Sequence, residues 1–204
     1  VSGNISSEQA ACLAEAAKLY GDGRLLLTTR LSFEIPGIPY EKIPEFSEYI
    51  GKAGLATGGT GPRVRPIVSC KGTTCQYGLI DTYAVSSKIH EKFYKGYYDV
   101  KLPHKFKIAV GGCPNSCIKP SLNDFGVMGY KGGYKVFIGG RWGKKHVEGM
   151  PLDRIIESED ELCEIIEKTI LLFKEQGNPG ERLSDMVRRL GFEYMQDQIM
   201  NSDI

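Results

Sequence analysis

Four cysteines in two close pairs are the residues of this chain with the clearest chemical potential. Four residues separate Cys70 from Cys75, and three separate Cys113 from Cys117. Four thiolates can hold a zinc ion or an iron–sulfur cluster. Zinc ribbons more often place two residues between the cysteines of each pair, so the spacing favours a cluster. Buried cysteines that bind no metal are the remaining interpretation of the pattern.

The second pair lies in a glycine-containing loop, Gly111-Gly-Cys-Pro-Asn-Ser-Cys117, directly after the strand-like segment 106–110. Glycines let a backbone approach an inorganic core closely, and Pro114 disfavours a helix inside the loop. Backbone N–H groups in such a loop can donate to cluster sulfurs and tune the reduction potential. The pattern therefore predicts an iron–sulfur site at a strand end.

Composition narrows the class of protein. The chain has 204 residues, of which 41% are hydrophobic and 25% are charged, with a formal net charge of +1. This balance is typical of a globular protein and lacks the basic excess of a nucleic-acid binder. No apolar run approaches the roughly 18 residues that span a bilayer, and the first twenty residues do not resemble a signal peptide. We therefore expect a cytoplasmic protein that binds neither nucleic acid nor membrane, in which clustered cysteines indicate metal or redox chemistry.

The elements that position the cysteines fall into two parts. In residues 1–55, Ser6 or Ser7 can cap a helix that runs through Leu19, and a strand at 24–29 and a helix at 43–51 follow. A glycine-rich passage at 57–62 precedes the larger part, 56–204. The fold class predicted from this order is α+β or mixed α/β.

The larger part alternates strands and helices. We expect strands at 64–69, 105–110, 125–130 and 134–138, with a hairpin turn at 131–133, and helices at 76–94, 158–175 and 181–190. Both cysteine loops then follow strands.

Four stretches of the chain resemble the sirohaem-containing sulfite and nitrite reductases, which couple a [4Fe–4S] cluster to an iron isobacteriochlorin. They occur in the family's order at 22–35, 61–70, 102–107 and 112–117, and segment 181–193 is similar to the family's closing helix. The resemblance implies a small ferredoxin-like half-domain at 1–55 and a sirohaem and [4Fe–4S] domain at 56–204. Larger members contain two homologous halves, whereas this chain looks like one half.

The resemblance also implies a cationic substrate site. Arg30 and Arg65 match the family's anion-binding arginines, and Lys105 and Lys107 match its paired active-site lysines. Guanidinium groups clamp oxyanions through fixed donor forks, and desolvated lysines can bind an anion and donate protons. We expect the two lysines to alternate along one strand and so to project from one face. Any one of these cations alone would be interpreted as a solvated surface residue.

Other segments are candidates for holding the carboxylate-rich sirohaem. Glycine-rich backbone can present amides as an anion-binding nest. The candidates are Thr57, Gly58, Gly59, Thr60, Gly61, Asn115, Gly139, Gly140 and Arg141. By resemblance, Cys70, Cys75, Cys113 and Cys117 hold the cluster, and Cys117 also bridges to the sirohaem iron. The first cysteine pair has four intervening residues where many members have five.

The predicted function is six-electron reduction of sulfite to sulfide, or of nitrite to ammonia. The chain lacks the ferredoxin-type cysteine run of some relatives, so a separate donor such as a ferredoxin must supply electrons. Cys113 lies six residues after Lys107, a distance of about 20 Å when the chain is extended. One half therefore cannot easily place both residues over one cofactor, and we expect a homodimer with shared sites. A non-catalytic electron-transfer or cofactor-holding protein and a structural zinc module are the alternatives.

Overall fold

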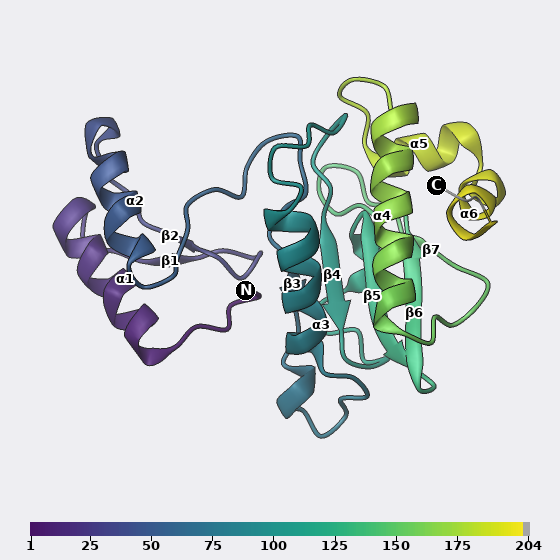
Figure 1. Cartoon of the computed structure of the whole chain (residues 1–204), viewed down its shortest axis with the longest axis horizontal. Coiled ribbons are helices and arrows are strands. Elements are labelled where there is room, and N and C mark those ends of the chain that lie inside the picture. The colour runs from purple at the N-terminus through teal and green to yellow at the C-terminus, as the bar shows by residue number, and fades with distance from the viewer. Residues whose placement is uncertain (202–204) are drawn as a thin grey trace. The chain divides into compact units, whose positions relative to one another are not determined.

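The computed structural model describes residues 1–201 and divides into two compact units, Val1–Gly59 and Thr60–Ile204 (Figure 1). From the sequence we expected this boundary after residue 55. Helices and strands are mixed in both units, which confirms the mixed α/β class. No helix within residues 1–201 is long and apolar enough to cross a membrane.

The N-terminal unit pairs two helices with a short hairpin. Helix α1 (Ser7–Tyr20) begins at Ser6, whose Oγ accepts from the Gln9 N–H, while the Gln9 side chain accepts from the Ser6 N–H. Helix α2 (Ile43–Gly51) packs Phe46 and Ile50 against the alanines of α1, and a 3-10 turn (Tyr40–Lys42) precedes it. The two predicted helices are therefore present at the expected positions.

The strand predicted in this unit is shorter than expected and pairs with a second strand in a hairpin. Strands β1 (Leu26–Leu27) and β2 (Phe33–Glu34) are antiparallel, whereas the sequence predicted a strand over 24–29. Asp22 accepts from the Arg24 backbone N–H, and Thr28 Oγ1 accepts from the N–H groups of Arg30 and Ser32. These side-chain hydrogen bonds replace ladder bonds and end the strand at both sides.

The second unit is built on a five-stranded sheet. Its strands are β3 (Val68–Ser69), β4 (Ile108–Gly111), β5 (Phe125–Tyr130), β6 (Gly133–Ile138) and β7 (Met150–Pro151), in that spatial order. Strands β3, β4 and β5 are mutually parallel, and β6 and β7 continue the sheet in antiparallel fashion. The β5–β6 turn has only two residues, Lys131 and Gly132, both with positive φ, as hairpins of this length require.

The helices of this unit differ from the prediction mainly at their ends. Helix α3 (Thr82–Ile89) begins at Asp81, whose carboxylate accepts two backbone N–H groups, and continues into a π-helix (His90–Lys95). The expected start at residue 76 is wrong because a 3-10 turn (Gly72–Thr74) and irregular backbone occupy that region. The helix predicted at 181–190 is present as α5 (Leu183–Leu190), which ends at Gly191, where φ is +90°, and a further helix that was not predicted, α6 (Phe192–Asn201), follows.

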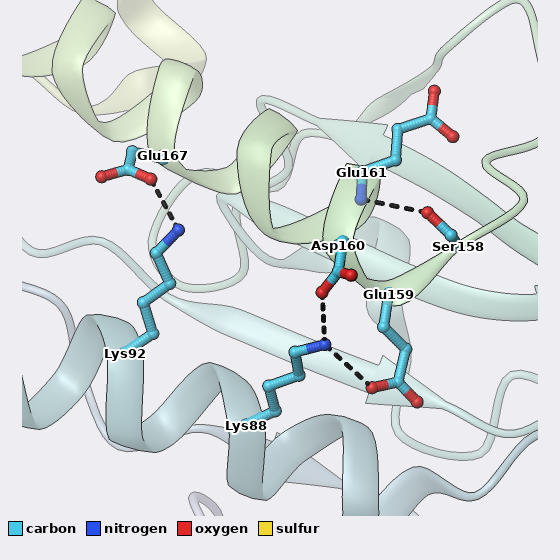
Figure 2. A network of polar contacts seen from close by, with 7 residues as sticks. All are labelled: Lys88, Lys92, Ser158, Glu159, Asp160, Glu161 and Glu167. Carbon is cyan, nitrogen blue, oxygen red and sulfur yellow. Dashed lines mark hydrogen bonds and ion pairs between the residues drawn. The ribbon is translucent and has the colours of Figure 1, made fainter.

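Helices α3 and α4 (Glu159–Gln176) lie side by side on one face of this sheet (Figure 1). Their apolar faces join one core with β4, β5 and β6, in which the rings of Phe106 and Phe173 are 6.1 Å apart. Figure 2 shows the polar rim, where Lys88 Nζ lies 2.8 Å from Asp160 and Lys92 Nζ lies 2.7 Å from Glu167. Such exposed pairs each contribute at most about 1 kcal/mol, so the core positions the helices.

Candidate active site

The two cysteine loops leave neighbouring parallel strands at the same edge of the sheet. Cys70 directly follows β3, and Cys113 lies two residues beyond β4. Ser69 is in register with Val110, and the Cys70 N–H donates to the Val110 carbonyl at 3.1 Å. The carboxyl edge of parallel strands is where open α/β sheets bind ligands. The structure therefore brings the two loops to one place, as the sequence predicted.

Glycines allow the two loops to touch backbone to backbone. A Cβ on Gly112 would lie 2.8 Å from the Gly72 Cα, and one on Gly78 would lie 1.9 Å from the Gly72 carbonyl oxygen. The Leu79 N–H closes the contact by donating to the Gly112 carbonyl at 2.9 Å. Side chains at Gly72 or Gly112 would therefore separate the loops, and one at Gly78 would distort the first loop itself.

One cysteine already carries the kind of hydrogen bond that a cluster ligand uses. The Gly112 N–H donates to Cys70 Sγ at 3.1 Å, and Thr82 Oγ1 donates to the Cys70 carbonyl at 2.7 Å. N–H donors to a thiolate withdraw charge from sulfur and raise the reduction potential of a bound cluster. Cys70, Cys75 and Cys113 are half-buried free thiols, and Cys117 is an exposed free thiol.

The thiols themselves do not converge. Within residues 1–201, no three Cys, His, Asp or Glu side chains form a group that could hold a metal ion. Soft sulfur donors on two touching, glycine-lined loops suit an iron–sulfur cluster in chemistry and in backbone arrangement. The four-thiol ligand set stays a prediction, as does the bridging role of Cys117.

The candidate cations of the second unit lie at the opposite ends of the same strands. Arg65 precedes β3, and its N–H donates to the Phe106 carbonyl at 2.8 Å. Lys105 and Lys107 flank Phe106 ahead of β4, so the prediction that both lie within a strand is wrong. Their N–H groups donate to side chains instead, that of Lys105 to His104 Nδ1 and that of Lys107 to Asp124 Oδ2. A backbone N–H that donates to a side chain cannot also donate to a neighbouring strand of the sheet.

A cavity of about 330 Å³ opens between these segments. Arg65 and Lys105 give its wall positive charge, His104 lies beside them, and prolines and glycines of the neighbouring turns, among them Gly61 and Gly180, complete it. This volume lies within the range of small-molecule sites, and its wall chemistry suits an anion. The structure thus brings Arg65 and Lys105 together.

Burial and mutual repulsion make these cations easier to deprotonate. Burial lowers the pKa of Lys105 below its usual value, and the guanidinium groups of Arg182 and Arg65 lower it further. Burial is also the main cause of the lowered pKa values of His104 and Arg65. A half-buried lysine with a lowered pKa can give up a proton more readily than a solvated one.

Sequence reasoning missed the ion pair behind this wall. Both carboxylate oxygens of Asp124 accept from Arg182, at 2.9 and 3.0 Å, and both side chains are buried. Asp124 directly precedes a strand with five buried residues, where an unpaired acidic side chain is rare. Its position in the sequence could therefore have indicated a buried carboxylate with a partner. Its partner is 58 residues away, and nothing local identifies Arg182.

The remaining candidates lie elsewhere in the two units. Arg30 belongs to the N-terminal unit, in the turn between β1 and β2, where its N–H donates to Thr28 Oγ1. Segment 57–61 crosses the boundary between the units, with positive φ at its three glycines. Asn115 is exposed in the turn between Cys113 and Cys117. The roles of these residues stay predictions.

The turn after β6 is fixed by its own contacts. The Gly139 N–H donates to the Asp124 carbonyl at 2.9 Å, and a Cβ on Gly140 would lie 2.1 Å from the Ser121 carbonyl oxygen. Arg141 Nη1 pairs with Asp185 of α5 at 3.0 Å, so its guanidinium already has an acidic partner. A cofactor carboxylate would share Arg141 with Asp185.

Known proteins resemble this chain over almost its whole length. Residues 60–203 match the nitrite and sulphite reductase 4Fe-4S domain, and residues 1–53 match the nitrite/sulfite reductase ferredoxin-like half domain. The coenzyme F420-dependent sulfite reductase of Methanocaldococcus jannaschii is 24% identical over 87% of the chain, which spans 37% of that enzyme. An uncharacterised protein of the same organism is 27% identical, with 97% of this chain and 87% of that protein covered.

A solved structure shows the same fold. The crystal structure of dissimilatory sulfite reductase I superposes with a TM-score of 0.86 at 17% identity and covers 100% of this chain and 68% of its own. The two family matches confirm the predicted ferredoxin-like half-domain and 4Fe–4S domain. The chain belongs to the nitrite and sulfite reductase 4Fe–4S domain family.

Proposed function

We propose that this protein reduces sulfite to sulfide at a sirohaem coupled to a [4Fe–4S] cluster. The observation that carries the proposal is the pair of cysteine loops, joined by the Gly72–Gly112 contact and by the N–H bond to Cys70 Sγ. The cationic cavity at the other end of β3 and β4 supports anion chemistry. The cluster and sirohaem, when bound, would relay electrons from the donor protein to the anion.

In this proposal the side chains of the chain bind the anion and deliver protons. Arg65 holds oxyanion oxygens through its guanidinium fork, and Lys105 donates a proton, aided by its lowered pKa. Arg30 and Lys107 contribute further positive charge. Cys70, Cys75, Cys113 and Cys117 would hold the cluster, and Cys117 would also be the ligand for the sirohaem.

Sulfite is preferred to nitrite because the paired arginines and lysines match the sulfite-reducing members of the family. Nitrite is the alternative substrate, since the same cationic wall suits both anions. Electrons come from a separate protein such as a ferredoxin.

The placement of charges at opposite strand ends supports a shared site in a homodimer. Lys107 and Cys113 are six residues apart, about 20 Å in extended chain, and β4 lies between them. One chain would supply Arg30, Arg65, Lys105 and Lys107 over the sirohaem held by the partner. A two-fold axis would make this contact reciprocal.

Anaerobic turnover with a reduced viologen dye tests the activity and separates the two substrates. We expect faster turnover of sulfite than of nitrite. Arg65→Ala should lose anion binding with both cofactors retained, whereas Arg63→Ala is a matched control because its guanidinium lies over the Tyr98 ring, 4.4 Å from the centroid. Full sulfite turnover by Arg65→Ala would remove Arg65 from the site.

A mixing experiment tests the shared site. Inactive Lys107→Ala and Cys117→Ser chains, when mixed at random, should regain about a quarter of the activity. A competent monomer in sedimentation, or no recovery from verified mixed dimers, contradicts the homodimer.

Two other functions make different predictions. A non-catalytic electron-transfer or cofactor-holding protein would bind both cofactors without turnover and would tolerate loss of Arg65 and Lys105. A structural zinc module would contain zinc and no tetrapyrrole.

A further inference from the structure

Among the ion pairs described for residues 1–201, the pair between Asp124 and Arg182 is the most buried. The Asp124 side chain is 0% exposed and the Arg182 side chain is 6% exposed. Arg182 occupies the N-cap position of α5, two residues after Gly180 of the cavity wall. Its Nε–H is buried without an acceptor in the described part of the chain. Burying a charged pair costs desolvation free energy that the attraction within the pair often does not offset, so stability alone does not explain a buried arginine here.

Asp124 ties together three segments that border the candidate site. Its carboxylate accepts from the Lys107 N–H at 2.9 Å and from Arg182, and its carbonyl accepts from the Gly139 N–H at 2.9 Å. These bonds fix the lysine segment, the turn after β6 and the start of α5 relative to one another. Gly180 is held as well, because its N–H donates to the Pro103 carbonyl at 3.0 Å.

The charge of Arg182 reaches the cavity wall. After burial, Arg182 is the largest cause of the lowered pKa of Lys105, ahead of Arg65, while Asp124 raises that pKa and Arg141 lowers it. Arg182 lies at the start of α5, Arg65 ahead of β3, Asp124 at the start of β5 and Arg141 in the turn after β6. His104 adjoins Lys105 in sequence. Arg182 has the same rank among the causes of the lowered pKa of His104.

We propose that Arg182, held in place by Asp124, is a positioning residue that fixes a positive charge behind the cavity and so makes Lys105 a readier proton donor. The use of that proton in anion reduction rests on the proposed function. The control of Lys105 by Arg182 does not, because it can be measured without turnover.

The two members of the pair should act on Lys105 in opposite directions. Removing Arg182 withdraws a positive charge and raises the pKa of Lys105. Asp124→Asn withdraws a negative charge while the guanidinium stays, and lowers the pKa further. If the pair only held the structure together, both substitutions would loosen the same wall, hydrate Lys105 and raise its pKa.

Trace acetylation of the full purified chain with acetic anhydride measures this pKa directly. Only the unprotonated amine reacts, so the yield at Lys105 as a function of pH, read by peptide mass spectrometry, gives its midpoint. In the unaltered chain the midpoint should lie below that of the exposed Lys101. Arg182→Gln should move it to higher pH and Asp124→Asn to lower pH. If the Arg182→Gln variant does not fold, Arg182→Met, whose side chain is similarly long, takes its place in the experiment.

Two controls separate charge from structure. Arg182→Lys keeps the charge and should leave the midpoint near that of the unaltered chain. Arg189→Gln removes an arginine of the same helix that pairs with Glu181, and it should leave the Lys105 midpoint unchanged. Equal midpoints for Lys105 and Lys101, or shifts in the same direction for Arg182→Gln and Asp124→Asn, overturn the proposal. Opposite shifts without sulfite or nitrite turnover would uphold it and reject the proposed function instead.

Discussion

Replacing Gly112 by alanine should separate the two cysteine loops. The new Cβ would lie 2.8 Å from the Gly72 Cα, 3.3 Å from Thr82 Cγ2 and 3.4 Å from Cys70 Sγ. A contact of 2.8 Å with a backbone atom cannot be relieved by a side-chain rotation, so one loop must move. That movement stretches the hydrogen bonds from Gly112 to Cys70 Sγ and from Leu79 to the Gly112 carbonyl.

The expected cost follows from these contacts. Overpacking of this kind costs about 1–3 kcal/mol, and the two weakened hydrogen bonds together cost about 1 kcal/mol, so we expect a loss of about 2–4 kcal/mol. With a urea m-value of about 2 kcal/mol/M, the unfolding midpoint falls by about 1–2 M. Cluster content should fall as well, because Cys70 and Cys113 adjoin the displaced backbone.

Urea unfolding followed by circular dichroism, with iron and acid-labile sulfide assays on the same samples, measures both effects. Gly51→Ala is the control, because no atom lies within 4 Å of the place that an added methyl group would take at this helix end, and the φ of Gly51 is not positive. Alanine there should stabilise by up to about 1 kcal/mol. A Gly112→Ala chain with unchanged midpoint and unchanged cluster content would refute the role given to the Gly72–Gly112 contact.

Three further substitutions test the charges of the cavity wall and the start of α4. Lys105→Met should stabilise the fold at pH 7, because a charged lysine whose pKa is lowered by folding destabilises the native state. The gain in the free energy of unfolding should shrink toward pH 10, and a gain that does not depend on pH contradicts this reasoning. Asp124→Asn leaves the buried Arg182 without its carboxylate and should cost about 3–5 kcal/mol in urea unfolding, whereas a loss below about 1 kcal/mol would show that the pair is solvated. Ser158→Ala removes the acceptor for the Glu161 N–H at the start of α4 and should cost about 1 kcal/mol; an unchanged thermal midpoint would show that the cap contributes nothing.

Local signals accounted for much of the fold. The apolar period of α4 and its Ser158 cap, and the β5–β6 hairpin with its glycine turn, were predictable because neighbours in sequence determine them. The cysteine loops were predicted at strand ends and lie there. At the start of α4, Ser158 Oγ accepts from the Glu161 N–H, and the Glu161 carboxylate accepts from the Glu157 N–H.

Long-range contacts were the part that the sequence did not disclose. Lys105 and Lys107 had the pattern of strand residues, but His104 and Asp124 take their backbone N–H groups and keep them out of β4. The partnership of Asp124 with Arg182 spans 58 residues, and no periodicity or motif indicates it. The cationic wall was recognised only where family resemblance marked it, and the charge behind it required the structure.

Whether the cysteine loops hold a cluster beside a sirohaem can be decided by the absorption spectrum of the anaerobically purified chain, read together with its metal content. We expect iron, acid-labile sulfide and the spectrum of an iron isobacteriochlorin. Zinc without a tetrapyrrole would contradict the proposed function.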